Sequence, residues 1–119
     1  MARKPLKHFG QVLREMRVAK GFSLRKFAEL LDVSPTYLSQ VEQRKADPPT
    51  AERVRRMAEL LGASADEMIA LAGRVPEDLP QIIQEQPTEI PNLLRAASGL
   101  TSEQLRRLTD SIRKLKREG

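Results

Sequence analysis

The stretch that decides the fold is SLRKFAELLDVSPTYLSQVE, residues 23–42. It predicts two short helices joined by a tight turn. Ser23 is placed to cap the first helix, because its hydroxyl can accept an unpaired backbone N–H of the first turn. Ser34 is placed to cap the second, and Pro35 suits that helix's first position, where a missing N–H costs nothing. The apolar residues recur at helical spacing and predict one shared inner face: Leu24, Phe27, Ala28, Leu31, Leu38 and Val41.

Four polar residues gather in the N-terminal half of the second helix. Thr36, Tyr37 and Gln40 are expected to point away from the inner face, and Ser34 stands at the same end. A helix that enters the DNA major groove contacts base edges with its N-terminal residues. Glutamine can bind adenine through two atoms, and threonine can contact a base through its hydroxyl or methyl group. Each residue alone could equally be an ordinary solvated side chain; their arrangement favours base contacts.

The whole pattern resembles the helix-turn-helix of the Cro/lambda-repressor-like (XRE) regulators, from about Phe9 to Gly73. The matching residues are Leu13, Arg17, Lys20, Gly21, Ser23, Phe27, Ala28, Leu31, Val33, Ser34, Tyr37, Leu38, Val41, Glu42, Pro49 and Thr50. The resemblance implies an all-α fold with a five-helix DNA-binding domain in residues 1–73. Residues 74–119, which the resemblance does not cover, are expected to form a short helical region for dimerisation. The resemblance also implies double-stranded DNA as the partner.

The resemblance assigns roles to residues around the two helices. It implies an ion pair between Arg17 and Glu42 that fixes the third helix against the first; the alternative is two independent surface charges. It also implies that Gln43, Arg44 and Lys45, in the loop after the third helix, contact phosphates. The start of the second helix suits a phosphate as well, through Ser23, the Leu24 N–H and Arg25. Such contacts position a protein on DNA without specifying the sequence.

The remaining helices of the first domain are expected at residues 6–20, 51–61 and 65–72. Their apolar residues are Phe9, Leu13, Met16, Val54, Met57, Ala58, Leu61, Met68, Ile69, Leu71 and Ala72. The lone His8 is interpreted as a surface residue, and Arg53, Arg55 and Arg56 as solvated. Residues 1–5 are expected to form a basic arm, and Arg3, Lys4 and Lys7 are either solvated or in contact with phosphates.

The second half of the chain changes in charge. Residues 75–94 contain no Lys or Arg, and prolines restrict them to short helices at about 78–86 and 89–98. A last helix, capped by Thr101, is expected to run to about Arg117. Its apolar residues are spaced as in a coiled-coil seam: Leu105, Leu108, Ile112 and Leu115. So short a seam must pack on the preceding helices or on a second copy, and we assign it to dimerisation. The basic residues beside it are interpreted as a solvated face.

Composition narrows the function. The 119 residues carry a net charge of +5, one His and no Cys. A basic balance suits a polyanionic partner, and the lack of cysteine excludes a disulfide framework or thiolate metal site. Neither a signal peptide nor a membrane span is recognisable, which favours the cytoplasm. No catalytic, metal-binding or cofactor motif is found, so an enzyme is disfavoured.

Two functions therefore remain. The leading one is a transcriptional regulator, most simply a repressor, that binds a near-palindromic operator as a homodimer. The alternative is an antitoxin or an antagonist-controlled regulator, in which residues 74–119 bind a protein partner such as a toxin.

Overall fold

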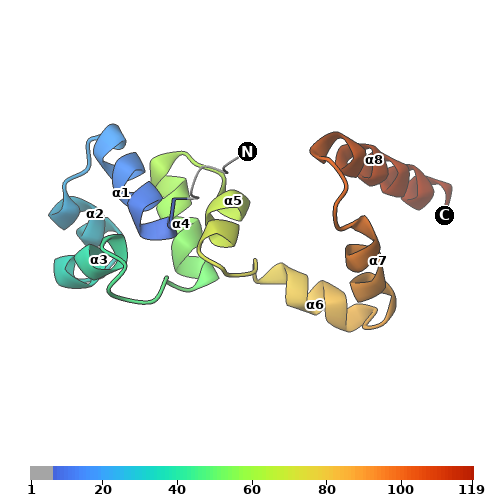
Figure 1. The fold of residues 1–119 in the computed structure, drawn as a ribbon, viewed down its shortest axis with the longest axis horizontal. Helices are drawn as coiled ribbons and strands as arrows, with labels where there is room; N and C mark the ends of the chain where they lie inside the picture. The colour runs from blue at the N-terminus through green and yellow to red at the C-terminus, as the bar shows by residue number, and fades with distance from the viewer. Residues whose placement is uncertain (1–6) are drawn as a thin grey trace, which may run out of the picture. The chain divides into compact units, whose positions relative to one another are not determined.

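The computed structural model describes residues 7–119, so the expected roles of Arg3 and Lys4 lie outside the described residues. Over the described part the chain is all-helical, which confirms the predicted fold class (Figure 1). Its helices are α1 (Phe9–Lys20), α2 (Leu24–Leu30), α3 (Pro35–Glu42), α4 (Ala51–Leu61), α5 (Ala65–Leu71), α6 (Asp78–Glu85), α7 (Glu89–Ala97) and α8 (Ser102–Glu118). The chain divides into two units within α6: the first ends at Pro80, and the second is Gln81–Gly119.

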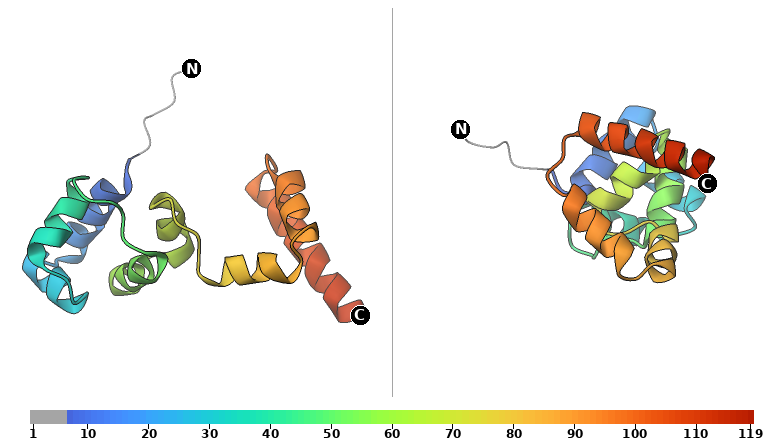
Figure 2. Two further views of the ribbon diagram at one scale, coloured as in Figure 1. Left: turned by 90° about the horizontal axis from the view of Figure 1, so that it is seen from below. Right: turned by 90° about the vertical axis from the view of Figure 1, so that its right-hand side faces the viewer.

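The first unit is built around one apolar core. Figure 2 shows the ribbon of its helices from two further sides. Each of its first five helices contributes a fully buried side chain: Leu13 from α1, Phe27 from α2, Leu38 from α3, Met57 from α4 and Ile69 from α5. Burying a side chain of this size stabilises a fold by about 1.5–3 kcal/mol. Helix α1 packs against α3 and α4, α2 against α3, and α4 against α5. The core therefore fixes α2 and α3 relative to the other three helices.

Side-chain caps set where the helices begin. A hydroxyl oxygen accepts the backbone N–H three residues later at the start of five helices, as the sequence predicts; the capping residues are Ser23, Ser34, Thr50, Ser64 and Thr101. Gly21 and Gly62 follow α1 and α4 with φ angles of 86° and 66°, in the left-handed region that glycine adopts without strain. The expected start of α1 at residue 6 is wrong. Helix α1 begins at Phe9, because His8 Nδ1 accepts the Gln11 N–H at 3.2 Å and caps the helix there.

Helix α1 lies against the C-terminal end of α3 at one buried glycine. A Cβ atom added at Gly10 would collide with the carbonyl oxygen of Val41 and would lie 2.8 Å from that of Glu42. Because these are backbone atoms, no side-chain rearrangement could make room. Gly10 therefore permits the close approach that sets α3 against α1.

The helices of the second unit are amphipathic, but none of α6, α7 and α8 has a buried residue. On α8, the predicted seam residues Leu105, Ile112 and Leu115 are 41%, 40% and 68% exposed, and Leu108 is half-buried. The predicted capping box at the start of α8 is present, with Thr101 N–H donating to Gln104 Oε1 at 3.0 Å. Over residues 7–119, no helix combines the length and apolar character needed to cross a membrane.

Candidate nucleic-acid interface

Helix α3 presents one face at the surface. Thr36, in its N-terminal half, and Gln40, in its C-terminal half, are exposed on this face. The sequence predicts their exposure but places Gln40 too close to the start of the helix. The expectation that Tyr37 points fully away from the core needs correction, because its ring is half-buried and packs against the core residues. The guanidinium of Arg53, expected to be solvated, lies over this ring at 5.8 Å from its centroid, within range of a cation–π attraction. Tyr37 is thus partly a structural residue that joins α3 to α4.

Several predicted DNA-contacting residues line one shallow hollow. Its lining comes from the start of α2, from α3 and from the following loop, and we call it the reading surface: Leu24, Pro35, Thr36, Ser39, Gln40, Gln43 and Lys45. The fold therefore brings together residues predicted separately as base contacts and phosphate contacts. Ser39 was missed by the sequence analysis. Its hydroxyl accepts a hydrogen bond of 2.8 Å from the Gln43 side-chain amide.

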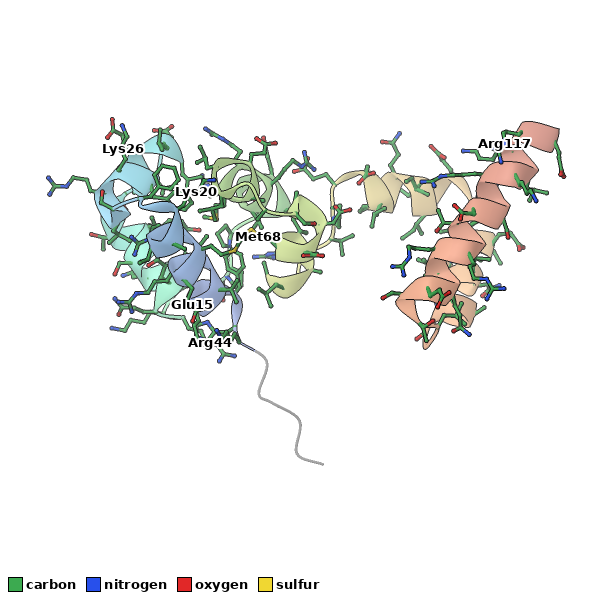
Figure 3. All side chains as sticks on the ribbon, turned by 90° about the horizontal axis from the view of Figure 1, so that it is seen from above. Glu15, Lys20, Lys26, Arg44, Met68 and Arg117 are labelled. Carbon is green, nitrogen blue, oxygen red and sulfur yellow. The ribbon has the colours of Figure 1, made fainter. Side chains whose placement is uncertain are left out.

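The predicted serines at the helix starts are already engaged in the protein. Ser34 Oγ accepts the Tyr37 N–H at 3.0 Å, and Ser23 Oγ accepts the Lys26 N–H at 3.0 Å. A serine hydroxyl that accepts in this way keeps its own hydrogen for a further contact. Arg25 is exposed beside Ser23. Figure 3 shows the Lys26 side chain of α2 at the surface of the first unit. The Met68 side chain, by contrast, lies inside that unit.

A buried ion pair holds α3 in place. Arg17 Nε lies 2.7 Å from Glu42 Oε2, and Arg17 Nη2 lies 2.9 Å from Glu42 Oε1. The third nitrogen, Nη1, donates to the carbonyl oxygen of Phe22 at 2.9 Å. The two residues are only 8% and 7% exposed, so they are not the independent surface charges of the alternative interpretation. This pair joins the end of α3 to α1, and Arg17 also links it to Phe22, two residues before α2.

The loop after α3 is anchored from a distant part of the chain. Arg74, which follows α5, donates to the carbonyl oxygens of Pro48 at 2.6 Å and Pro49 at 3.1 Å. Near the start of the loop, Lys45 N–H donates to Gln40 O at 2.8 Å. Arg44 has a φ of 63°, which turns the backbone out of the helical path. The loop is therefore fixed at both ends while Arg44 and Lys45 remain exposed.

Positive charge near this loop is partly neutralised. Lys7 Nζ lies 2.9 Å from Glu15 Oε2, and the hydrogen bond from this ammonium lowers the pKa of the Glu15 carboxyl. Within residues 7–119, Arg44 and Lys45 form no such ion pair. Figure 3 shows the Arg44 side chain at the surface near the start of α1. The loop therefore keeps two uncompensated cations beside the reading surface, a charge arrangement suited to phosphate.

The chain is similar to one protein family and to several known regulators. The family described as a helix-turn-helix domain matches residues 8–71, from the cap of α1 to the last residue of α5. The HTH-type transcriptional regulator SinR of Bacillus licheniformis is 27% identical over 111 residues, which cover 92% of this chain and 96% of SinR. The regulator RamB of Mycobacterium tuberculosis is 31% identical over 101 residues, 78% of this chain, but the chain spans only 21% of RamB. A crystal structure of SinR in complex with DNA is 28% identical and covers 51% of this chain and 97% of its own, with a TM-score of 0.47.

Proposed function

The chain belongs to the helix-turn-helix family of DNA-binding transcriptional regulators, and from this premise we propose that it is a repressor that binds a near-palindromic operator as a homodimer. The observation that carries the proposal is the reading surface on α3. An α-helix with its side chains is about 10–12 Å across. The major groove of B-form DNA is about 12 Å wide and admits such a helix.

The residues divide into two roles on the DNA. Thr36 and Gln40 contact base edges, with the half-buried Tyr37 beside them and Ser34 at the start of the helix. A glutamine suits adenine, which offers a donor and an acceptor side by side in the major groove. Phosphates are contacted at the two rims of the surface: by Ser23, the backbone N–H of the half-buried Leu24 and Arg25 at the start of α2, and by the exposed Arg44 and Lys45 in the loop after α3. The rim contacts orient α3, and the contacts of α3 specify the operator.

Dimerisation follows from the energetics of a small module. One five-helix domain reaches few phosphates, whereas two linked domains gain affinity through effective concentration. Two copies of α3 then enter successive turns of the groove, about 34 Å apart. The apolar residues of α8 support this proposal as the seam, with Leu105, Ile112 and Leu115 exposed and Leu108 half-buried. Repression results when the bound dimer occupies DNA that the transcription machinery needs, and we place this action in the cytoplasm.

A second candidate function rests on α7. Leu93 and Leu94 are 41% and 56% exposed, so the second unit offers apolar surface beyond the α8 seam. Such surface suits a protein antagonist or a toxin that binds the second unit and controls the regulator. Co-purification of a partner in one-to-one ratio would favour this candidate, and self-association of the full chain alone would favour the homodimer.

The proposed roles are tested by measuring DNA affinity over a range of salt concentrations. Lys45→Ala should weaken binding to every duplex and lower the slope of log K against log salt by about one unit. Gln40→Ala should instead reduce discrimination between operator and random duplex by about 1–3 kcal/mol. Lys114→Ala, in the second unit, removes the same charge far along the chain and should leave the slope unchanged. A Lys45 variant with the wild-type slope, or a Gln40 variant equally weak on all duplexes, would contradict the assignment.

A further inference from the structure

Gln43 makes a side-chain contact that its place at the end of a helix does not predict. Its Nε2 donates to Ser39 Oγ at 2.8 Å, one helical turn earlier. Both residues line the reading surface with Thr36 and Gln40. Because residues three, four and seven apart share a helix face, Thr36, Gln40 and Gln43 form one row along α3. Gln43 thus continues the line of Thr36 and Gln40 to the C-terminal end of α3.

The contact with Ser39 fixes Gln43 before any DNA binds. A free glutamine side chain has many rotamers, and it loses that freedom when it is ordered in an interface. A side chain already held in one conformation loses less on binding. Ser39 itself is half-buried, while Gln43 is exposed. The Ser39 hydroxyl is thus the more enclosed of the two groups, and the Gln43 amide is the group presented to a ligand.

The amide suits a base edge better than a phosphate. One N–H of the Gln43 amide is engaged with Ser39, which leaves the second N–H and Oε1. A phosphate offers only acceptors, so it could engage only the remaining N–H and would leave Oε1 without a donor. Adenine offers an acceptor and a donor together in the major groove and would satisfy both remaining groups. Arg44 and Lys45, directly after Gln43, already supply charge for the backbone.

From this geometry we propose that Gln43 contacts a base, not the phosphate that the sequence led us to expect, and that Ser39 is its positioning residue. The inference rests on the proposed entry of α3 into the major groove. It adds a third specificity-determining side chain to Thr36 and Gln40. It also gives Ser39 a role in DNA recognition, because Ser39 holds the Gln43 side chain in position without contacting a base itself. The base pair concerned lies farther along the half-site than those contacted by the start of α3.

The test is selection from a random duplex library with the full-length protein, followed by competition binding on the selected sequence with each base pair changed in turn. Gln43→Ala should reduce discrimination at one base pair in each half-site by about five- to hundredfold and leave the others intact. Ser39→Ala should weaken discrimination at that same base pair, and Ser39→Thr, which keeps the hydroxyl, should restore it. The double variant Ser39→Ala with Gln43→Ala should be no less selective than Gln43→Ala alone.

Three outcomes would overturn the inference, once an unchanged melting temperature shows that the variants fold. The first is a Gln43→Ala protein that loses affinity equally on all duplexes and shows a lower salt slope, which marks a phosphate contact. The second is a Gln43→Ala protein with the wild-type preference at every base pair. The third is a Ser39→Ala protein that changes a different base pair. Failure of the proposed function is distinct, because the wild-type protein would then select no shared sequence at all.

Discussion

Removing the carboxylate of Glu42 should be among the most destabilising single changes in the first unit. Glu42→Ala leaves the Arg17 guanidinium buried at 8% exposure, with the carbonyl oxygen of Phe22 as its remaining acceptor. Breaking one partner of a buried pair typically costs about 3–5 kcal/mol, a large part of the roughly 5–15 kcal/mol that stabilises a whole domain. For a domain of this size each kcal/mol lowers the melting temperature by about 4–8 °C. We therefore expect a loss of at least about 12 °C.

The assay is thermal unfolding followed by circular dichroism, with urea unfolding to obtain the free energy. The matched control is Glu15→Ala, which breaks the pair with Lys7; these side chains are 49% and 56% exposed. An exposed pair contributes little to stability, because solvent screens it, so the control should melt close to wild type. The double variant Arg17→Met with Glu42→Leu should recover most of the loss, because no charge remains buried. If the Glu42→Ala protein had the same melting temperature as the Glu15→Ala protein, the Arg17–Glu42 pair would not be what holds α3.

Three other changes test the packing, the loop and the seam. Gly10→Ala should destabilise the first unit by at least about 1–3 kcal/mol, because the new Cβ meets backbone carbonyls of α3; a wild-type melting temperature would contradict the close approach. Arg74→Ala should cost about 1 kcal/mol of stability and lower affinity for all duplexes, since the loop that carries Lys45 loses its anchor; unchanged DNA affinity would argue against that anchoring. Leu108→Glu with Ile112→Glu should give monomers by sedimentation while Ser111→Glu should not, and a dimer that survives the double change would exclude α8 as the seam.

The features that the sequence predicted best are local ones. A serine or threonine before an apolar run marks a helix start through a hydrogen bond to a residue only three positions away, as at Ser34 and Thr50. The spacing of apolar residues likewise identifies the buried face, and Phe27 and Met57 are fully buried as expected. Met16 and Leu24 are only partly buried, and Leu71 has 38% of its surface exposed. Its position at the last turn of α5 leaves it at the edge of the core.

The features that were missed depend on contacts between distant segments or on unusual chemistry. The Arg56 guanidinium, expected to be solvated, donates to the carbonyl oxygen of Leu30 at 3.2 Å, and Arg74 reaches across a similar separation to the loop. No local spacing signals such a contact. The half-burial of Tyr37 also depends on α4, from which Arg53 covers its ring. His8 escaped notice because an imidazole is not among the preferred N-cap side chains.

The central claim is that the row of side chains on α3 specifies a DNA sequence, and the most direct test is selection from a random duplex library at modest ionic strength. The account predicts that the wild-type protein enriches a near-palindromic sequence whose half-sites are centred about one helical turn apart. It also predicts that the double variant Thr36→Ala with Gln40→Ala, folded to the same degree, enriches no such sequence. A wild-type protein that enriched no shared sequence, or a double variant that enriched the same one, would contradict the account.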